Sequence, residues 1–166
     1  MDDPATQIAA LQQQVQLLMD EREITRLLLA LSRTVDEKDF DGLASLYAVD
    51  GTLATPWGSH SGRAGKAEYV RKDLGHFHAM HHVGAGYEIQ VEPGASTATA
   101  RMTLLATHVS DSGGTHFTTV GGYYDVDLVR EDGKWRRKRV TPHPQWRFSA
   151  SGKEAAAPAR DERWVP

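Results

Sequence analysis

Apolar residues recur every three or four positions through the first 35 residues, which is the spacing of one face of an α-helix. Residues 5–35 are therefore predicted to form one long helix or two joined helices, with the core part running from about Glu21 to Val35. Before Glu21 the chain is rich in glutamine, and its regularly spaced apolar positions are Ile8, Leu11, Val15 and Leu18. We expect this stripe to pack on a neighbouring subunit or on the domain's own sheet.

The next segment predicts short elements. Asp39 is a candidate N-cap for a short helix that carries Phe40, Leu43, Leu46 and Tyr47. Asp50-Gly51 is typical of a turn. A short strand over 52–57, a Gly/Ser loop over 58–65 and a third helix from Lys66 to Leu74 should follow.

After Leu74 the pattern changes to alternation, which predicts strands over 80–91, 97–110, 115–130 and 134–141. The tail from Pro142 is predicted to be irregular, with Trp146 and Phe148 folding back over the domain. Helices followed by a long antiparallel meander indicate the α+β class, with helices on one side of a curved sheet. We expect a helical extension over 1–20, one domain over 21–148 and an irregular tail over 149–166.

Composition narrows the function classes. The chain has 166 residues, a net charge of −3 and no cysteine. The charge gives no basic footprint for nucleic acid, and the lack of cysteine excludes thiolate nucleophiles, disulfides and Cys-ligated zinc. No apolar run approaches the ~20 residues of a membrane span, and the N-terminus does not resemble a signal peptide. A cytoplasmic location and no membrane partner are the expectation.

Asp36 and His81 are the candidate catalytic pair. In the strand 81–91 the odd positions are His81, Val83, Ala85, Tyr87, Ile89 and Val91, which places His81 on the buried face. Asp36 ends the helical run, one turn after Ser32. A carboxylate that contacts an imidazole would orient the ring and raise its basicity, as a general base requires. The competing interpretation is that Asp36 caps the helix or pairs with Arg33 and that His81 is a satisfied core histidine. A structure with His81 on the solvent face of the sheet would overturn the enzyme interpretation.

Other histidines offer further interpretations. His108 shares the apolar face of the strand 97–110 and joins His81 there. The cluster His76, His78, His81 and His82 could suggest a metal site, but no helix-borne His-Glu-x-x-His is present. We expect no metal and no cofactor, so that a chelator should leave activity unchanged.

An ordered set of segments resembles a known family. The segments are Val35 to Phe40, Met80 to Gly84, Val120 to Asp125 and Asp132 to Trp135. They are similar to the SnoaL-like branch of the nuclear-transport-factor-2-like superfamily, to which scytalone dehydratase, bile-acid 7α-dehydratase and lindane dehydrochlorinase belong. The resemblance implies a cone: a curved mixed sheet wrapped by helices around a deep pocket, also described as a cystatin-like α+β barrel.

The resemblance also implies roles for residues. Asp36 and His81 match the family's Asp–His dyad, and His108 resembles a second pocket histidine. Arg139 falls near the position of a pocket arginine in several relatives, with Arg137 on the same strand face. Thr55 and Trp57 are further candidates for contact with substrate. Thr55 and Val35 stand where a dehydratase relative has tyrosines, so the water held by those tyrosines is not expected here.

Two functions from different classes remain open. The first is a cofactor-independent dehydratase-like lyase or isomerase that acts on a small, largely apolar oxygenated or cyclic substrate. The second is a non-catalytic ligand-binding or assembly domain, such as the small subunit of a ring-hydroxylating oxygenase. In either case we expect a homo-oligomer, a trimer ahead of a dimer. It would form through the outer sheet face that carries Thr103, Leu105 and Thr107, with the 8–18 stripe contributing.

Overall fold

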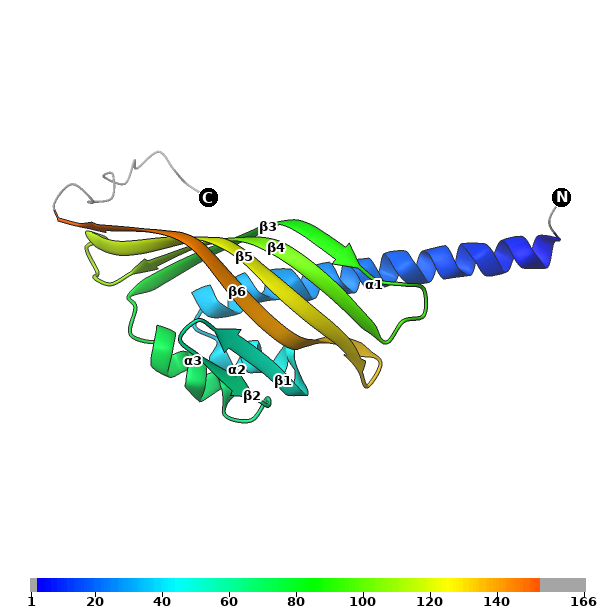
Figure 1. The fold of residues 1–166 in the computed structure, drawn as a ribbon, viewed down its shortest axis with the longest axis horizontal. Coiled ribbons are helices and arrows are strands. Elements are labelled where there is room, and N and C mark those ends of the chain that lie inside the picture. The colour runs from blue at the N-terminus through cyan, green and yellow to red at the C-terminus, as the bar shows by residue number, and fades with distance from the viewer. Residues whose placement is uncertain (1–2, 153–166) are drawn as a thin grey trace, which may run out of the picture.

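The computed structural model describes residues 3–152, and Figure 1 shows their arrangement. The helices and strands are α1 (Pro4–Asp36), α2 (Phe40–Ser45), β1 (Tyr47–Thr55), β2 (Gly58–Ser61), α3 (Lys66–Leu74), β3 (Ala79–Gln90), β4 (Thr97–Val109), β5 (His116–Glu131) and β6 (Lys134–Ser151). Three helices thus precede or interrupt the first strands, and a long meander follows.

The strands form one curved, unclosed sheet in the order β2-β1-β6-β5-β4-β3. The pair β1–β6 is parallel, whereas the remaining neighbours are antiparallel. This confirms the α+β class and the curved mixed sheet. The C-terminal half of α1 crosses one face of the sheet, and α2 and α3 pack together beside the hairpin of β1 and β2 (Figure 1).

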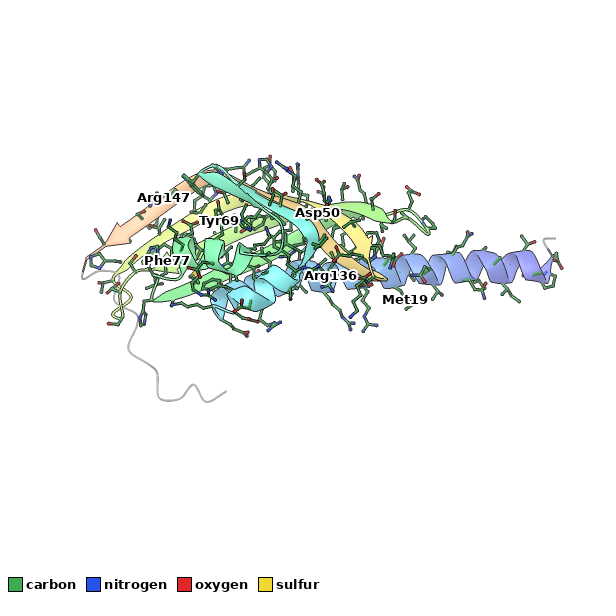
Figure 2. The ribbon with its side chains drawn as sticks, turned by 90° about the horizontal axis from the view of Figure 1, so that it is seen from below. Met19, Asp50, Tyr69, Phe77, Arg136 and Arg147 are labelled. Atoms are coloured by element: carbon green, nitrogen blue, oxygen red, sulfur yellow. The ribbon has the colours of Figure 1, made fainter. Side chains whose placement is uncertain are left out.

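Helix α1 is one continuous element of 33 residues. Its buried stripe comprises Ile24, Leu27, Leu28, Leu31 and Val35, which recur at helical spacing and pack against the sheet. The preceding half extends beyond the sheet (Figure 1), and every residue from 3 to 16 is exposed. Figure 2 shows Met19 where α1 leaves the domain. Only the second half of the helix is therefore held by the core.

Helix α1 packs mainly against β3, and β4 beside it presents small and medium-sized side chains to the inner face of the sheet. Ala98, Ala100, Met102, Leu104 and Ala106 share this face, and all five side chains are buried. Their alternation with exposed residues follows the period of two that was predicted for this strand. The core is completed by buried side chains on β5 and β6: Val126, Leu128, Trp135 and Val140.

Two local predictions are confirmed. Asp39 caps α2, because its Oδ1 accepts the backbone N–H of Gly42 at 2.8 Å. Helix α3 spans Lys66–Leu74, as the pattern predicted.

Three local predictions are wrong. Asp50-Gly51 forms no turn, since β1 continues through it with a register shift against β6 between Tyr47 and Thr52. Part of the expected loop 58–65 forms β2. Strand β6 runs on to Ser151, past Pro142 and Pro144. Because β1 pairs with β6 only as far as Val140, the later part of β6 is an edge that tolerates proline. The rest of the tail, from residue 153, lies outside the described residues.

Candidate active site

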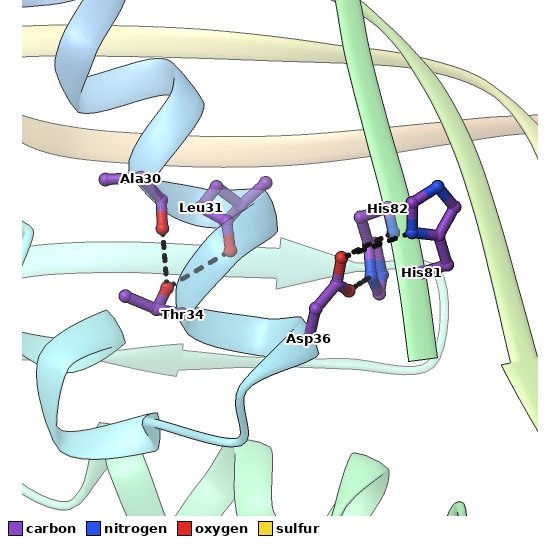
Figure 3. Close-up of polar contacts among 6 residues, drawn as sticks. All are labelled: Ala30, Leu31, Thr34, Asp36, His81 and His82. Atoms are coloured by element: carbon purple, nitrogen blue, oxygen red, sulfur yellow. Dashed lines mark hydrogen bonds and ion pairs between the residues drawn. The ribbon is translucent and has the colours of Figure 1, made fainter. Parts of the chain in front are cut away.

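Asp36 is the last residue of α1, and its carboxylate bonds twice to one residue of β3. Its Oδ1 lies 2.6 Å from Nδ1 of His82, and its Oδ2 accepts the backbone N–H of His82 at 2.9 Å (Figure 3). A carboxylate at a helix C-terminus faces the negative end of the helix dipole, and these two bonds offset that unfavourable position. Arg33, the alternative partner, pairs with Glu37.

The histidine of the dyad is therefore His82, and the prediction of His81 is wrong. The side chain of His82 is 7% exposed, whereas that of His81 is 77% exposed. His81 lies on the solvent face of the sheet, and its Nδ1 is 3.9 Å from Oδ2 of Asp36. The enzyme interpretation cannot rest on His81 and must stand on His82.

A β-bulge explains the error. The register between β3 and β4 shifts between Ala85 and Glu88, and Gly86 adopts a φ of 59° there. A bulge inserts one residue and reverses which side chains face inward. Tyr87, Ile89 and Val91 do pack against the core, as the alternation predicted. Before the bulge, however, it is the even positions Met80 and His82 that face inward. The Gly at 86 was the only local signal of this reversal.

His108 lies beside the dyad, as predicted. Its ring centroid is 5.3 Å from that of His82 and 4.8 Å from that of Phe77, on which it stacks. Its Nε2 is buried and has no hydrogen-bond partner among the described residues. Burial, followed by the charge of a protonated His82, lowers the pKa of His108 to about 4. The ring is therefore neutral at pH 7 and can donate one hydrogen bond.

The two histidines line a pocket between α1, α3 and the sheet. It contains about 870 Å³ of empty space, including its open mouth. Its lining is mostly apolar and includes Leu31, Val35, Leu104 and Ala106. Such a pocket, with a few polar groups that converge in it, is typical of a small-molecule site.

Thr55 and Trp57, the further candidates for contact with substrate, both line this pocket. Trp57 is 78% exposed and lies at the mouth. The hydroxyl of Thr55 donates to the carbonyl of Gly58 at 2.9 Å and accepts the N–H of Trp57 at 3.3 Å. Thr55 therefore uses its hydroxyl to form the β1–β2 turn.

Arg139 does not reach the pocket. It is exposed and pairs in register with Thr52 and Asp127 on the neighbouring strands. The register of β5 and β6 shifts between Asp127 and Leu128, so Arg137 and Arg139 lie on opposite faces of β6. This second irregularity contradicts both the role predicted for Arg139 and the shared face.

Arg137 is the buried arginine instead. Its Nη2 donates to the carbonyls of Leu27 and Leu28 in α1, while its Nε and Nη1 have no partner among the described residues. Its guanidinium carbon lies 5.9 Å from the centroid of the Tyr47 ring. Arg137 is therefore buried between β6 and α1, and it is not among the residues that line the pocket.

Two tyrosines that the sequence pattern did not single out line the pocket. Tyr47 is the first residue of β1 and Tyr124 lies within β5, and both residues line the pocket. Burial raises the pKa of Tyr47 to about 12 and raises that of Tyr124 as well. Both phenols stay protonated at neutral pH and can donate hydrogen bonds. The only signal for Tyr124 in the sequence was its parity on the predicted strand 115–130, whereas Tyr47 was expected in a short helix and begins β1 instead.

The described residues hold no cluster of three His, Asp or Glu side chains suited to a metal ion. Of the cluster considered above, the centroid of the His76 ring lies 4.1 Å from that of the Phe77 ring in a tilted arrangement, and His82 is bound to Asp36. None of the helices within residues 3–152 is long and apolar enough to cross a membrane.

Solved structures similar to this chain share its fold. A protein from Novosphingobium aromaticivorans DSM 12444, assigned as a scytalone dehydratase, has a TM-score of 0.72 at 21% identity, covering 90% of this chain and 99% of its own. A type 2 hexachlorocyclohexane dehydrochlorinase (LinA) has a TM-score of 0.76 at 17% identity, covering 89% and 99%. An NTF2-like protein with a cystatin-like fold from Novosphingobium aromaticivorans has a TM-score of 0.67 at 26% identity, covering 86% and 90%.

None of the curated proteins matches the chain significantly. The model of the SnoaL-like domain matches residues 16–141, which is more than half of the sequence. The matched range contains Asp36, both dyad candidates on β3, His108 and the strands that surround the pocket. This chain therefore belongs to the SnoaL-like domain family.

Proposed function

We propose that the protein is a cofactor-independent lyase or isomerase in which His82, held by Asp36, removes a proton from a small, largely apolar oxygenated or cyclic substrate. The observation that carries the proposal is the 2.6 Å contact between Asp36 Oδ1 and His82 Nδ1 beside an apolar pocket. The dehydratase and the dehydrochlorinase among the similar folds support an elimination.

The proposal implies definite proton positions, because an ionised carboxylate can only accept a hydrogen bond. The Nδ1–H of His82 donates to Asp36, which leaves Nε2 unprotonated and able to accept the proton of the substrate. The carboxylate stabilises the imidazolium that forms. In an elimination, the electron pair of the broken C–H bond forms a carbon–carbon double bond and expels halide, or expels a hydroxyl group that takes the proton from the His82 imidazolium and leaves as water. In an isomerisation, the electron pair forms a double bond at a new position, and the His82 imidazolium returns its proton to another carbon.

Neutral donors surround the reacting position. His108 is held neutral by its burial, and the phenols of Tyr47 and Tyr124 remain protonated. Any of the three can donate to a carbonyl or to a leaving oxygen, where negative charge develops. In an apolar pocket such bonds are stronger than in water because the dielectric constant is lower.

The test compares two adjacent histidines. The purified protein is incubated in D₂O with a panel of hydroxylated and halogenated cyclic ketones and cycloalkanes. Release of water or halide and uptake of deuterium at carbon are then measured. His82→Gln and Asp36→Asn should lower the rate by about 10²–10⁴-fold, the usual contribution of a general base. His81→Gln is the matched control and should keep the wild-type rate.

Equal losses in His81→Gln and His82→Gln would contradict the proposal, as would a panel on which the wild type is inert. The alternative is a non-catalytic binding or assembly domain, favoured by the bond from the His82 backbone to Asp36, which ties α1 to β3. In that case Asp36→Asn should lower the unfolding midpoint while no variant changes any turnover.

A further inference from the structure

The N-terminal half of α1 carries an apolar stripe that the domain does not cover. Its members Ile8, Leu11, Val15 and Leu18 are 55–63% exposed. The stripe belongs to a regular helix that is continuous with the anchored half. Because the domain holds the second half of α1 in a helix, the first half extends an existing helix and needs no nucleation of its own. The exposed stripe therefore has a fixed helical conformation.

The spacing of the stripe is that of a coiled-coil seam. The intervals of three, four and three residues place Ile8 and Val15 at a positions and Leu11 and Leu18 at d positions of two consecutive heptads. A β-branched residue at a with leucine at d favours two parallel strands. The seam ends at the next a position, which is Arg22.

The flanks of the seam do not oppose pairing of identical chains. The positions beside it, e and g, are Gln7, Gln12, Gln14 and Met19, so no charge repels its own copy. These positions also carry no charge with which a charged partner could form an ion pair. The seam also points away from the domain. At about 100° per residue, its centre lies roughly 160° around the helix from the stripe that packs on the sheet.

From these observations we infer that residues 8–19 pair with the same segment of a second copy, as a short parallel two-stranded coiled coil that makes the protein a homodimer. The domains lie on the outer sides of the pair, because the sheet contacts the opposite face of α1. The expectation from the sequence is a homo-oligomer, a trimer ahead of a dimer. The dimer is inferred because β-branched residues at a and leucine at d favour a coiled coil of two helices.

The first experiment measures the mass of the full chain by sedimentation equilibrium up to about 100 µM, where mass action favours association. The wild type should approach twice the monomer mass. Leu11→Glu/Val15→Glu places charges in the seam and should shift dimerisation to at least tenfold higher concentration. Ala9→Glu/Gln13→Glu adds the same charges away from the seam and should dimerise like the wild type. Circular dichroism would show that each variant is folded.

The second experiment tests the parallel register. The chain has no cysteine, so a single introduced thiol can bond only to its copy. Leu11→Cys should form a disulfide-linked dimer on mild oxidation, at least tenfold faster than Gln13→Cys on the far side of the helix. A monomeric wild type, a trimer mass, a dimer that survives Leu11→Glu/Val15→Glu, or equal cross-linking of the two cysteine variants would each overturn the inference.

Discussion

At the scale of single residues, the site depends on which rings carry protons. Asp36 receives the Nδ1–H of His82, and this contact leaves one ring nitrogen of His82 available as an acceptor. His108 differs, because its buried Nε2 has no partner among the described residues and its pKa is lowered to about 4. The pocket thus places a ring that is bound to a carboxylate beside a ring whose burial disfavours protonation.

The behaviour of His108 predicts a dependence of stability on pH. The unfolded chain protonates this ring near pH 6.5, while the folded protein does so only near pH 4. Folding should therefore become less favourable as the pH falls from about 6.5 to about 4, with no effect from this ring above pH 7. After discounting for solvent screening at a half-buried ring, the loss should be about 1–2 kcal/mol.

Urea unfolding at pH 4.5 and at pH 7 measures this loss. The difference between the free energies of unfolding at the two pH values should be smaller in His108→Gln than in the wild type. His116, which is exposed on β5, offers the matched control His116→Gln, which should keep the wild-type difference. An unchanged pH dependence in His108→Gln would show that other groups cause it.

At the scale of elements, the bulge in β3 determines which of its two adjacent histidines faces the interior. Gly86 holds the left-handed φ that the bulge needs, and a Cβ there would lie 3.2 Å from Oγ1 of Thr103. The hydroxyl of Tyr87 donates to the carbonyl of Gly84 at 2.7 Å across the same irregularity. This short segment reverses the facing of the strand and brings His82 to Asp36.

We expect Gly86→Ala to lower the free energy of unfolding by about 1–2 kcal/mol, the cost of a left-handed residue with a side chain. It should also move the ¹⁵N resonances of the His82 ring, because the strain lies on the strand that carries it. Gly94→Ala is the matched control, with a φ of 75° and open space around the added Cβ. It should destabilise to a similar degree and leave the His82 resonances in place. If the His82 ring resonances were the same in both variants, the bulge would not determine the position of His82.

At the scale of the whole molecule, one buried carboxylate joins the domain to its helical extension. Asp20 is buried where α1 leaves the sheet, and its Oδ1 accepts hydrogen bonds from Arg130 at 2.6 Å and from the Trp135 indole at 3.2 Å. Gln16, one turn earlier, bonds to the same oxygen. The extension therefore projects from a fixed point of the fold.

Removing that carboxylate should release the junction. We expect Asp20→Ala to lower the free energy of unfolding by about 2–4 kcal/mol, because Arg130 loses its partner in a largely buried setting. Asp50→Ala, which breaks the exposed ion pair with Lys138, is the control and should leave the unfolding midpoint nearly unchanged. Chemical denaturation measures both; a midpoint for Asp20→Ala equal to that of the control would contradict this role.

The sequence by itself determined the elements and their class. The periodicity of α1, the cap at Asp39, helix α3 and the four long strands were all predicted, because local spacing and capping chemistry act within a few residues. The same spacing identified Asp36 and His108 as polar residues on apolar faces; His108 lines the pocket, and Asp36 contacts His82, which also lines it.

Only the tertiary structure decided which neighbours meet. His82 replaces His81, and Arg139 points away from the pocket, because register shifts in β3 and β6 reverse the side of the sheet that each residue faces. A bulge is a property of two paired strands, and its position depends on a partner far away in the sequence. The same holds for β6 beyond Pro142, whose strand conformation depends on pairing with β5 along an otherwise free edge.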